Sequence, residues 1–271
     1  MKLVTIGDCG VDRYLPDNKL RPGGITANFT RQARICFDAT DQIDLISLIG
    51  TDHPECDVAF DAVNIANINC HINRYDSKTP IQYIEILDSG EKNFTHYEPG
   101  VLEHFYLDEK QKKVLANADL IMTPVYWQIH NVFDTVFSSK LGGTIAVDFS
   151  DFSTDSDFEL LNKYIDKINI AFFGLNSSQT DLIDQLKTIA NEKEKLFVIT
   201  LGSEGSIAFK NDQKLCQSPI NVDKIVDTTG AGDAYAAGFL SQYSKLSLQE
   251  CMELGTENAA KTIQFFGSVP D

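Results

Sequence analysis

The stretch Asp227–Phe239, DTTGAGDAYAAGF, combines two aspartates with flexible glycines directly before a predicted helix. A helix that begins at about Ala231 leaves its first backbone N–H groups without intrahelical acceptors, and the helix dipole adds partial positive charge there. Gly230 and Gly232 let another group approach this backbone closely. The pattern therefore predicts an anion site that holds a phosphoryl group through backbone amides.

Asp233 lies in the first turn of this predicted helix, where its carboxylate can face the same anion site. A carboxylate beside a phosphate is useful if its task is to accept a proton from an attacking hydroxyl. The alternative is an acidic residue that only complements the helix dipole, which is common. The residues alone leave both interpretations open.

The elements that must position this helix are suggested by short β-branched runs that alternate with longer helical patterns. The later runs are apolar on both faces, and the polar stretches between them are long enough for crossover helices, as parallel sheets require. The expected strands are residues 3–7, 43–50, 119–123, 144–150, 168–173 and 196–202. The sequence thus predicts an α/β fold with a doubly wound, mostly parallel sheet, formed by a single domain over residues 1–271.

One segment departs from this alternation. Thr79–Gly100 has the pattern of two strands around an Asp-Ser-Gly turn, with no helix between them. Together with residues 10–22, we interpret it as a small β lid; the alternative is an antiparallel extension that only covers an edge of the core. Exposed strand edges need cover, which makes a homodimer through the lid a hypothesis.

Composition restricts the partners. The chain of 271 residues has 39 acidic and 23 basic residues, a net charge of -16, which argues against binding of nucleic acid or anionic membranes and favours a small molecule. The six cysteines form no C-x-x-C pair, so reduced thiols in a cytoplasmic protein are expected. The apolar run at the N-terminus is too short for a signal peptide or a membrane span.

Three motifs carry a resemblance to a known family. DTTGAGD resembles the carboxyl-terminal signature of the ribokinase-like (PfkB) carbohydrate kinases. PGGITANFT (Pro22–Thr30) resembles the loop with which that family holds the sugar, and TLGSEGSIAF (Thr200–Phe209) is similar to its T-x-G-x-x-G turn beside the nucleotide. The resemblance implies a ribokinase-like fold and transfer of phosphate from ATP, with Mg²⁺, to a primary alcohol of a sugar. The lysine-dependent motif G-x-x-x-x-G-K-[ST] is absent from the sequence.

The resemblance also implies roles for particular residues. Asp233 would be the general base, while Gly230, Ala231 and Gly232 would stabilise the transferring charge through their amides. Asp8 is a second candidate for hydroxyl binding beside Asp12, and turn capping is the alternative for either. The implied substrate-binding residues are Asp12, Gly23, Gly24 and Asn28, and the implied nucleotide-binding residues are Thr200, Gly202, Gly205 and Asn258.

The sequence departs from the family where many members have N-x-x-E. Here NSSQ keeps Asn176 but places Gln179 at the acidic position, and a neutral amide cannot supply a carboxylate's attraction for Mg²⁺. The metal would then be held mainly by ATP and water, or Asp148 or Asp181 would assist, or this alignment is shifted. The protein ligands of the metal are therefore left unassigned.

A monovalent cation and the substrate are further expectations from the resemblance. Asp227 and the backbone around Thr229 match the region where several relatives hold a potassium-like ion; turn capping by Asp227 is the alternative. The segments TIGDCGVD, YEPGV, AVDFSD and GTENAAKTIQFFG resemble a subgroup that phosphorylates the 6-hydroxyl of fructoselysine or a related fructosamine. A fructokinase, a pentose or nucleoside kinase, and a catalytically weak sugar- or nucleotide-binding regulator are the alternatives. Tyr126, Trp127 and Glu98 are candidate wall and charge partners of the substrate, with core packing or surface exposure as the other interpretation.

Overall fold

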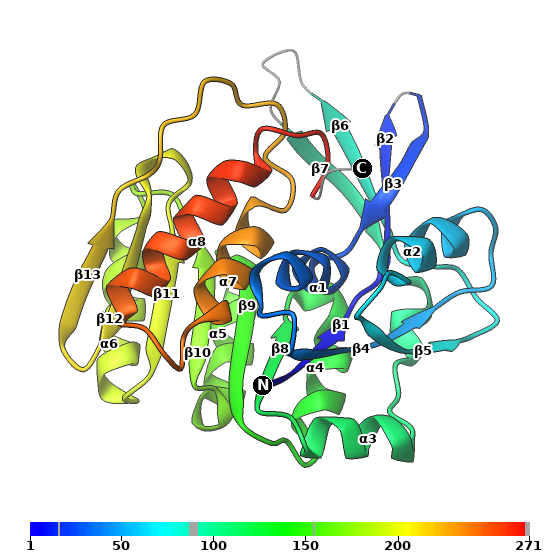
Figure 1. Cartoon of the computed structure of the whole chain (residues 1–271), viewed down its shortest axis with the longest axis horizontal. Coiled ribbons are helices and arrows are strands. Elements are labelled where there is room, and N and C mark those ends of the chain that lie inside the picture. Colours follow the sequence, from blue (N-terminus) through cyan, green and yellow to red (C-terminus); the bar gives the residue numbers. More distant parts are fainter. Residues whose placement is uncertain (16, 87–91, 154, 269–271) are drawn as a thin grey trace.

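A large mixed sheet forms the centre of the computed structural model, which describes residues 1–15, 17–86, 92–153 and 155–268 (Figure 1). Within these residues it has nine strands in the order β13-β12-β11-β10-β9-β8-β1-β4-β5. Neighbours from β5 to β11 run parallel, whereas β12 and β13 are antiparallel. The strands are β1 (Lys2–Gly7), β4 (Gln42–Ile49), β5 (Asn69–Arg74), β8 (Leu120–Pro124), β9 (Thr144–Asp151), β10 (Ile170–Gly174), β11 (Leu196–Thr200), β12 (Ser206–Lys210) and β13 (Gln213–Gln217).

Helices cover both faces of this sheet. One face packs against α1 (Ile25–Cys36), α7 (Ala231–Ser241) and α8 (Leu248–Thr262). The other packs against α3 (Glu109–Ala116), α4 (His130–Phe137), α5 (Asp155–Tyr164) and α6 (Thr180–Glu192). Short 3₁₀ turns occupy Gly100–His104, Trp127–Ile129, Ile165–Lys167 and Gly202–Glu204. The arrangement confirms the predicted α/β fold with a doubly wound, mostly parallel sheet.

A second sheet lies above the carboxyl edge of the main one (Figure 1). Its strand order is β3-β2-β6-β7, and we call it the lid. The strands are β2 (Gly10–Leu15), β3 (Lys19–Gly23), β6 (Ile81–Ile86) and β7 (Lys92–Glu98). Two strands were predicted within residues 79–100 and both are present, while the predicted Asp-Ser-Gly turn lies outside the described residues. A homodimer through this sheet stays a prediction.

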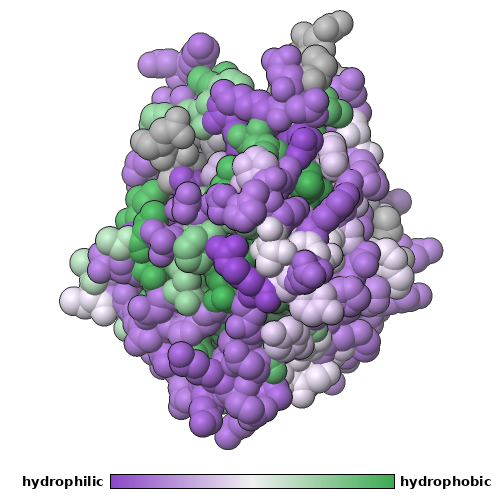
Figure 2. All heavy atoms as spheres, turned by 90° about the vertical axis from the view of Figure 1, so that its right-hand side faces the viewer, coloured by the Kyte–Doolittle hydropathy of each residue, from purple (hydrophilic) through white to green (hydrophobic). Residues whose placement is uncertain are grey.

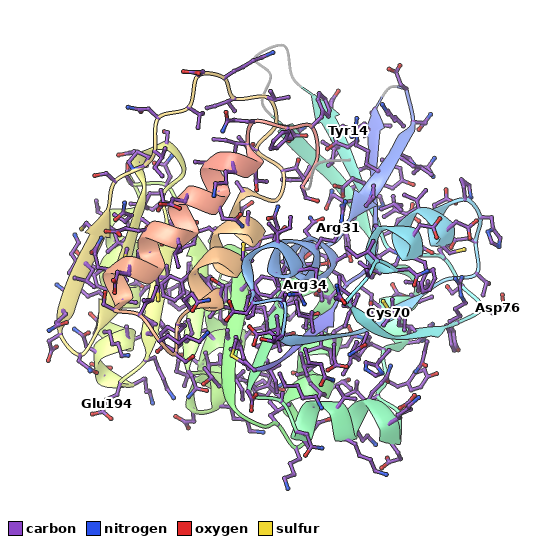
Figure 3. All side chains as sticks on the ribbon, in the orientation of Figure 1. Tyr14, Arg31, Arg34, Cys70, Asp76 and Glu194 are labelled. Atoms are coloured by element: carbon purple, nitrogen blue, oxygen red, sulfur yellow. The ribbon has the colours of Figure 1, made fainter. Side chains whose placement is uncertain are left out.

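The helix α2 (Glu55–Val63) packs between the lid and the edge of the main sheet, around a third apolar cluster. The lid strands alternate in the direction of their side chains, so that Asp12 and Tyr14 share one face with Gln82. Tyr14 is labelled in Figure 3. Arg13 points to the opposite face and forms an ion pair with Glu55 of α2. We call the face of Asp12 the inner face of the lid, because Asp12 is buried there against the core.

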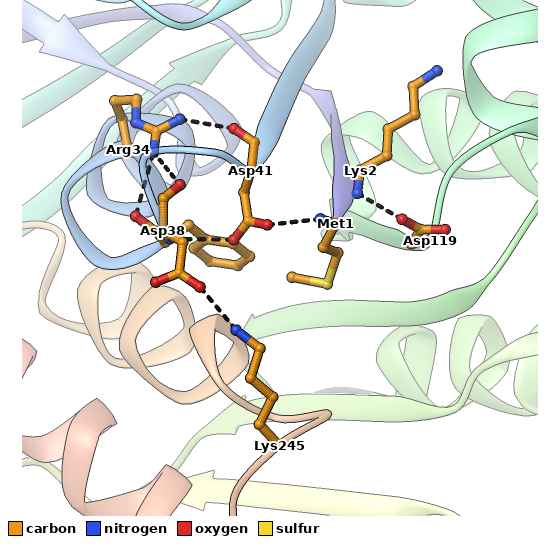
Figure 4. Close-up of polar contacts among 8 residues, drawn as sticks. Met1, Lys2, Arg34, Asp38, Asp41, Asp119 and Lys245 are labelled. Atoms are coloured by element: carbon orange, nitrogen blue, oxygen red, sulfur yellow. Dashed lines mark hydrogen bonds and ion pairs between the residues drawn. The ribbon is translucent and has the colours of Figure 1, made fainter.

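A polar cluster holds the far end of α1 (Figure 4). The Met1 amino group lies 2.7 Å from Asp41 Oδ1, and Lys245 Nζ lies 2.8 Å from Asp38 Oδ2. The Arg34 guanidinium donates to the carbonyl oxygens of Asp38 and Asp41 at 2.8 and 3.1 Å. These contacts tie β1, α1 and the turn after α7 together. The opposite ends of α1 and α7, where the two helices begin, lie at the candidate active site described below.

In the described part of the chain, no helix is both long enough and apolar enough to cross a membrane.

Candidate active site

Four buried aspartates converge above the carboxyl edge of the main sheet. Asp8 follows β1, Asp148 lies near the end of β9, Asp12 comes from the lid and Asp233 from α7, and each is less than one tenth exposed. Burial raises the pKa of Asp233 well above its ordinary value, and the charges of Asp148, Asp8 and Asp12 act in the same direction. A hydrogen bond from Asn28 opposes this shift. The fold therefore brings Asp12, Asn28 and Asp233 together, and their roles stay predictions.

The start of α7 is open on the side where an anion would approach. Its N-cap is Gly230, with φ of 74°, and no side chain caps the helix. A Cβ atom on Gly232 would meet no heavy atom within 4 Å, whereas one on Gly230 would lie 2.5 Å from Ser268 Cβ. Gly230 thus lets the chain turn beneath Ser268, while Gly232 leaves space above the first amides. The predicted helix start at Ala231 is confirmed.

The start of α1 is capped by an aspartate from another element. Asp8 Oδ2 accepts from the Ile25 amide at 2.9 Å, and Asp8 Oδ1 accepts from the Thr26 amide at 2.9 Å. Gly24, with φ of 97°, brings the chain against Asp8, and a Cβ atom on Gly23 would lie 2.3 Å from Asp12 Oδ1. Of the two aspartates considered from the sequence, Asp8 makes the capping contact, and Gly23 makes room for Asp12.

The C-terminal segment closes the site from the other side. Ser268 is buried, and its hydroxyl donates to Asn28 Oδ1 at 2.6 Å, while its carbonyl oxygen accepts from Gln32 Nε2 at 2.6 Å. The Gly267 amide donates to Asp227 Oδ2 at 3.0 Å, and Asp227 Oδ1 accepts from the Thr229 amide at 2.7 Å. Asp227 therefore makes the turn-capping contact considered from the sequence, and the cation near Asp227 and Thr229 stays a prediction.

Two tyrosines join the lid to the main sheet. The Tyr126 hydroxyl lies 3.2 Å from Asp8 Oδ2 and 2.8 Å from the hydroxyl of Tyr97 in β7, and the two rings meet edge to face. Tyr126 was predicted from the sequence as a candidate substrate contact, but Tyr97 was not, although Tyr97 shares the inner face of the lid with Gln82. The strand alternation from Asp12 could have indicated it.

Two other residues suggested as substrate partners lie elsewhere. Glu98 is on the outer face of the lid, where its carboxylate pairs with Lys78 at 3.0 Å and accepts from the Tyr83 hydroxyl at 3.0 Å. Trp127 is half exposed and stacks on His130. The interpretation of Glu98 as a substrate partner was therefore wrong, because strand alternation turns its side chain away from Asp12.

The two glycines of the turn after β11, Gly202 and Gly205, have different surroundings. Thr200 ends the strand, and Gly202, with φ of 58°, would place a Cβ atom in open space. A Cβ atom on Gly205 would lie 2.1 Å from the Gln217 carbonyl oxygen, so this glycine is needed for the turn itself. Gly202 is consequently the position at which a nucleotide could approach the backbone.

Asn258 has a different environment from the one that the sequence predicted. It is buried, and its side-chain nitrogen donates to Gln32 Oε1 at 3.1 Å and to the Ala234 carbonyl oxygen at 2.8 Å. These bonds tie α8 to α1 and α7. The geometry supports a role in helix packing and gives no support to an adenine contact.

The NSSQ loop, residues 176–179, is closed by hydrogen bonds among its own residues. Gln179 Oε1 accepts from the Asn176 amide at 2.7 Å and so closes the loop. Asp181 is exposed in the first turn of α6. Asp148, in contrast, lies beside Asp233, and burial raises its pKa to about 6, with Asp151 and Asp8 acting in the same direction. Among the acids considered for the metal, Asp148 is the one that the fold places at the site.

An uncapped helix start, a buried carboxylate in its first turn and a lid over a doubly wound sheet are the features expected of a phosphotransferase of the ribokinase type. Residues 128–270, more than half of the chain, match the pfkB family carbohydrate kinase. The chain is 30% identical to the fructoselysine 6-kinase of Escherichia coli (strain K12) over 98% of each protein. It is 26% identical to a fructosamine kinase of Bacillus subtilis (strain 168), over 99% of this chain and 93% of that one.

The solved structures agree on the fold. The Arabidopsis thaliana ribokinase complexed with ribose and ATP superimposes with a TM-score of 0.77, covering 99% of this chain and 95% of that one at 19% identity. This protein belongs to the PfkB family and is a carbohydrate kinase. Kinases of this family use ATP and Mg²⁺.

The two glycines at the start of α7 give a paired prediction. Gly232→Ala should fold with unchanged or slightly higher thermal stability, because alanine favours a helix over glycine by about 1 kcal/mol. Its turnover should nevertheless fall by roughly 10²-fold, the size expected when a charge-stabilising donor cannot act, because the added methyl group enters the open space through which a phosphate would reach the amides. Gly230→Ala should instead destabilise the fold, because φ of 74° and the contact with Ser268 both oppose a side chain. Thermal unfolding and ATP consumption distinguish the two, and wild-type turnover in Gly232→Ala would contradict the anion site.

The proximity of Asp148 to Asp233 predicts how the pH profile of kcat/KM changes when Asp148 is replaced. Asp233 must lose its proton to act as a base, and the Asp148 charge raises its pKa. Asp148→Asn should therefore move the acidic limb of kcat/KM to lower pH. Burial raises the pKa of Asp148 from its ordinary 3.8 to about 6, so ionisation of Asp148 opposes folding as pH rises through this window. The variant should therefore gain stability mainly above pH 6.

The exposed Asp181→Asn is the matched control for this profile, since it removes one charge from a surface helix. Its acidic limb should coincide with that of the wild type. If the acidic limb of the kcat/KM profile of Asp148→Asn coincides with that of the wild type, the ionisations of Asp148 and Asp233 are not coupled.

Proposed function

We propose that the protein transfers the γ-phosphoryl group of ATP to the 6-hydroxyl of fructoselysine or a related fructosamine. The observation that carries the proposal is the position of Asp233, buried beside Asn28 and Asp12 in the first turn of an uncapped helix. The two fructosamine-type relatives, which align over nearly the whole chain, support the choice of substrate.

In the proposed reaction, Asp233 accepts the proton of the primary hydroxyl as its oxygen forms a bond to the γ-phosphorus. The bond from that phosphorus to the bridging oxygen breaks, and ADP leaves with the electron pair. Amides of Ala231 and Gly232 hold the negative charge that spreads over the transferring group. The open space at Gly232 and the absence of a side-chain cap fit this task.

The residues of the site also fit Mg²⁺, although not through the motif that many relatives use. Mg²⁺ prefers carboxylate oxygens, water and phosphate, and Asp148 is the carboxylate that faces Asp233. Gln179 Oε1 is already occupied by the Asn176 amide. Bound beside Asp148, the ion would neutralise charge on the phosphates.

For the sugar, Asp12 and Asn28 supply acceptors and a donor toward hydroxyls, and Gly23 and Gly24 keep the adjoining backbone free of side chains. The amino-acid part of the substrate carries a carboxylate. Arg21 pairs with Asp12 across β2 and β3 on the inner face of the lid. Its guanidinium lies 4.7 Å from the Phe266 ring and forms no ion pair within the described residues. A guanidinium can bind a carboxylate through two parallel hydrogen bonds, so we assign it this contact.

Replacement of the proposed base tests the reaction. Asp233→Asn should lower turnover by roughly 10²- to 10⁴-fold while the substrate still binds. ATP consumption with Mg²⁺ is measured against fructoselysine, other fructosyl-amino acids, fructose, ribose and adenosine. Binding is followed through Trp127, the one tryptophan of the chain, which adjoins Tyr126.

Turnover confined to fructosyl-amines and lost in Asp233→Asn would support both substrate and base. Turnover of a free sugar or a nucleoside would be consistent with the proposed mechanism but would contradict the proposed fructosamine substrate. Binding of sugar or ATP without turnover of any compound would favour a regulator.

Substitution of Arg21 tests the carboxylate contact. Arg21→Gln should raise KM for fructoselysine roughly 10- to 100-fold, as expected for the loss of a charge-assisted hydrogen bond, with little change in kcat. The decarboxylated analogue, fructosyl-cadaverine, should show no such change. Lys19→Gln, an exposed cation on the same strand and face, is the control. An equal rise in KM for both compounds would overturn the assignment.

A further inference from the structure

A histidine, a cysteine and an aspartate meet at the start of α2, on the side of the lid away from the carbohydrate site. His53 Nδ1 lies 2.7 Å from Asp57 Oδ2 and 3.5 Å from Cys56 Sγ. Cys56 Sγ lies 3.8 Å from Asp57 Oδ1. One ligand atom from each residue can be chosen so that all three lie within 4.8 Å of one another. Within the described residues, no other group of three such side chains comes together in this way.

These distances are close to those of a tetrahedral metal site. Zinc binds sulfur at about 2.3 Å, nitrogen at about 2.0–2.1 Å and oxygen at about 2.0–2.2 Å, so the edges of the tetrahedron are about 3.3–3.6 Å. The edge from His53 Nδ1 to Cys56 Sγ, at 3.5 Å, already has this length, and the 3.8 Å edge from Cys56 Sγ to Asp57 Oδ1 is close to it. His53 Nδ1 contacts the other oxygen of Asp57, Oδ2, so the Asp57 carboxylate has to turn for one oxygen to complete the triangle. The side chains of His53 and Asp57 are 67% and 55% exposed, which leaves them free to adjust. A metal can therefore replace the proton that they share and keep one position for water.

The chemistry of the donors favours a particular class of ion. An imidazole and a thiolate bind Zn²⁺ and similar transition metals, whereas Mg²⁺ and Ca²⁺ prefer oxygen donors. The metal ligand is the thiolate form of cysteine. Burial raises the pKa of the Cys56 thiol, and the Arg74 guanidinium acts in the opposite direction. The charges of Asp57 and Asp52 also raise this pKa, and a bound cation would reverse their effect.

The cluster adjoins the segment that holds the lid. Asp52 Oδ1 accepts from the amide of Thr79 at 2.8 Å and from its hydroxyl at 2.6 Å, directly before β6. The Thr51 amide donates to the Ser77 carbonyl oxygen at 3.1 Å, and Asp76, labelled in Figure 3, accepts from the Thr51 hydroxyl. The strand β2 is held through the ion pair between Arg13 and Glu55. Both inner strands of the lid are thus attached to residues 51–55.

We propose that His53, Cys56 and Asp57 bind one Zn²⁺ or similar transition-metal ion, and that the bound ion stiffens residues 51–57 and with them the base of the lid. The site is separate from the Mg²⁺ of phosphoryl transfer and does not depend on the proposed substrate. Figure 2 shows that the face carrying the lid and α2 is predominantly hydrophilic, so ions from solvent can reach it.

Cobalt is the probe for this site, because a thiolate ligand gives Co²⁺ a charge-transfer absorption band that Mg²⁺ sites lack. Untagged protein should develop this band up to one equivalent of Co²⁺, and Zn²⁺ should abolish it. Cys56→Ser should remove the band, and His53→Ala and Asp57→Asn should each weaken binding at least tenfold. Cys216→Ser, which changes an exposed cysteine on β13, should leave the titration unchanged.

Several outcomes would overturn the site. These are the absence of the band, its loss in Cys216→Ser instead of Cys56→Ser, or wild-type affinity in both His53→Ala and Asp57→Asn. If Cys56→Ser unfolds, the affinities of His53→Ala and Asp57→Asn for Co²⁺ test the site instead, because these two exposed side chains contribute little to the core. Hydrogen exchange of residues 51–57 and 76–80 should slow when Zn²⁺ is added to the full chain. Unchanged exchange despite binding would overturn the stiffening of the lid.

Discussion

The burial of four carboxylates at one edge of the sheet is the constraint on which the rest of the site depends. A buried charge is costly unless hydrogen-bond donors surround it. The start of α1 supplies two amides to Asp8, and the Ser150 amide donates to Asp148 at 2.8 Å. Asp233 receives a hydrogen bond from Asn28, but burial and three neighbouring charges still raise its pKa. The pKa is thus raised on the residue that we propose as the proton acceptor.

Much of the fold could be predicted because the central strands carry local signals. The apolar runs at residues 3–7 and 144–150 are buried on both faces, and such runs are typical of parallel strands. The edge strands β5 and β13 were missed, because a strand at the edge of a sheet is partly solvated and these two, NCHINR and QKLCQ, are largely polar. Their pairing depends on the neighbouring strand, which no short window of sequence contains.

The surroundings of the candidate site residues could be predicted only where the sequence pattern is local. The glycines and Asp233 at the start of α7 lie within four residues of one another, so their pattern carries both the turn and the charge. Asp8 and Asp12 could not be distinguished in the sequence, because both follow β1 and only the placement of α1 decides which one caps it. Asn258 was assigned to the nucleotide from the resemblance of its segment, and its contact with Gln32, 226 residues away in the sequence, has no local signal. Long-range packing thus decided the roles that local patterns left open.

The contacts of Ser268 have a consequence for how the enzyme is made. Ser268 packs on Gly230 and bonds to Asn28, so one of the last described residues is part of the wall around Asp233. A nascent chain on the ribosome can pair β1 with β4 and β8 long before this residue emerges from the exit tunnel. The pocket around Asp233 is therefore completed only after residue 268 has emerged, and a polypeptide released before that residue would acquire most of the sheet without this wall of the pocket.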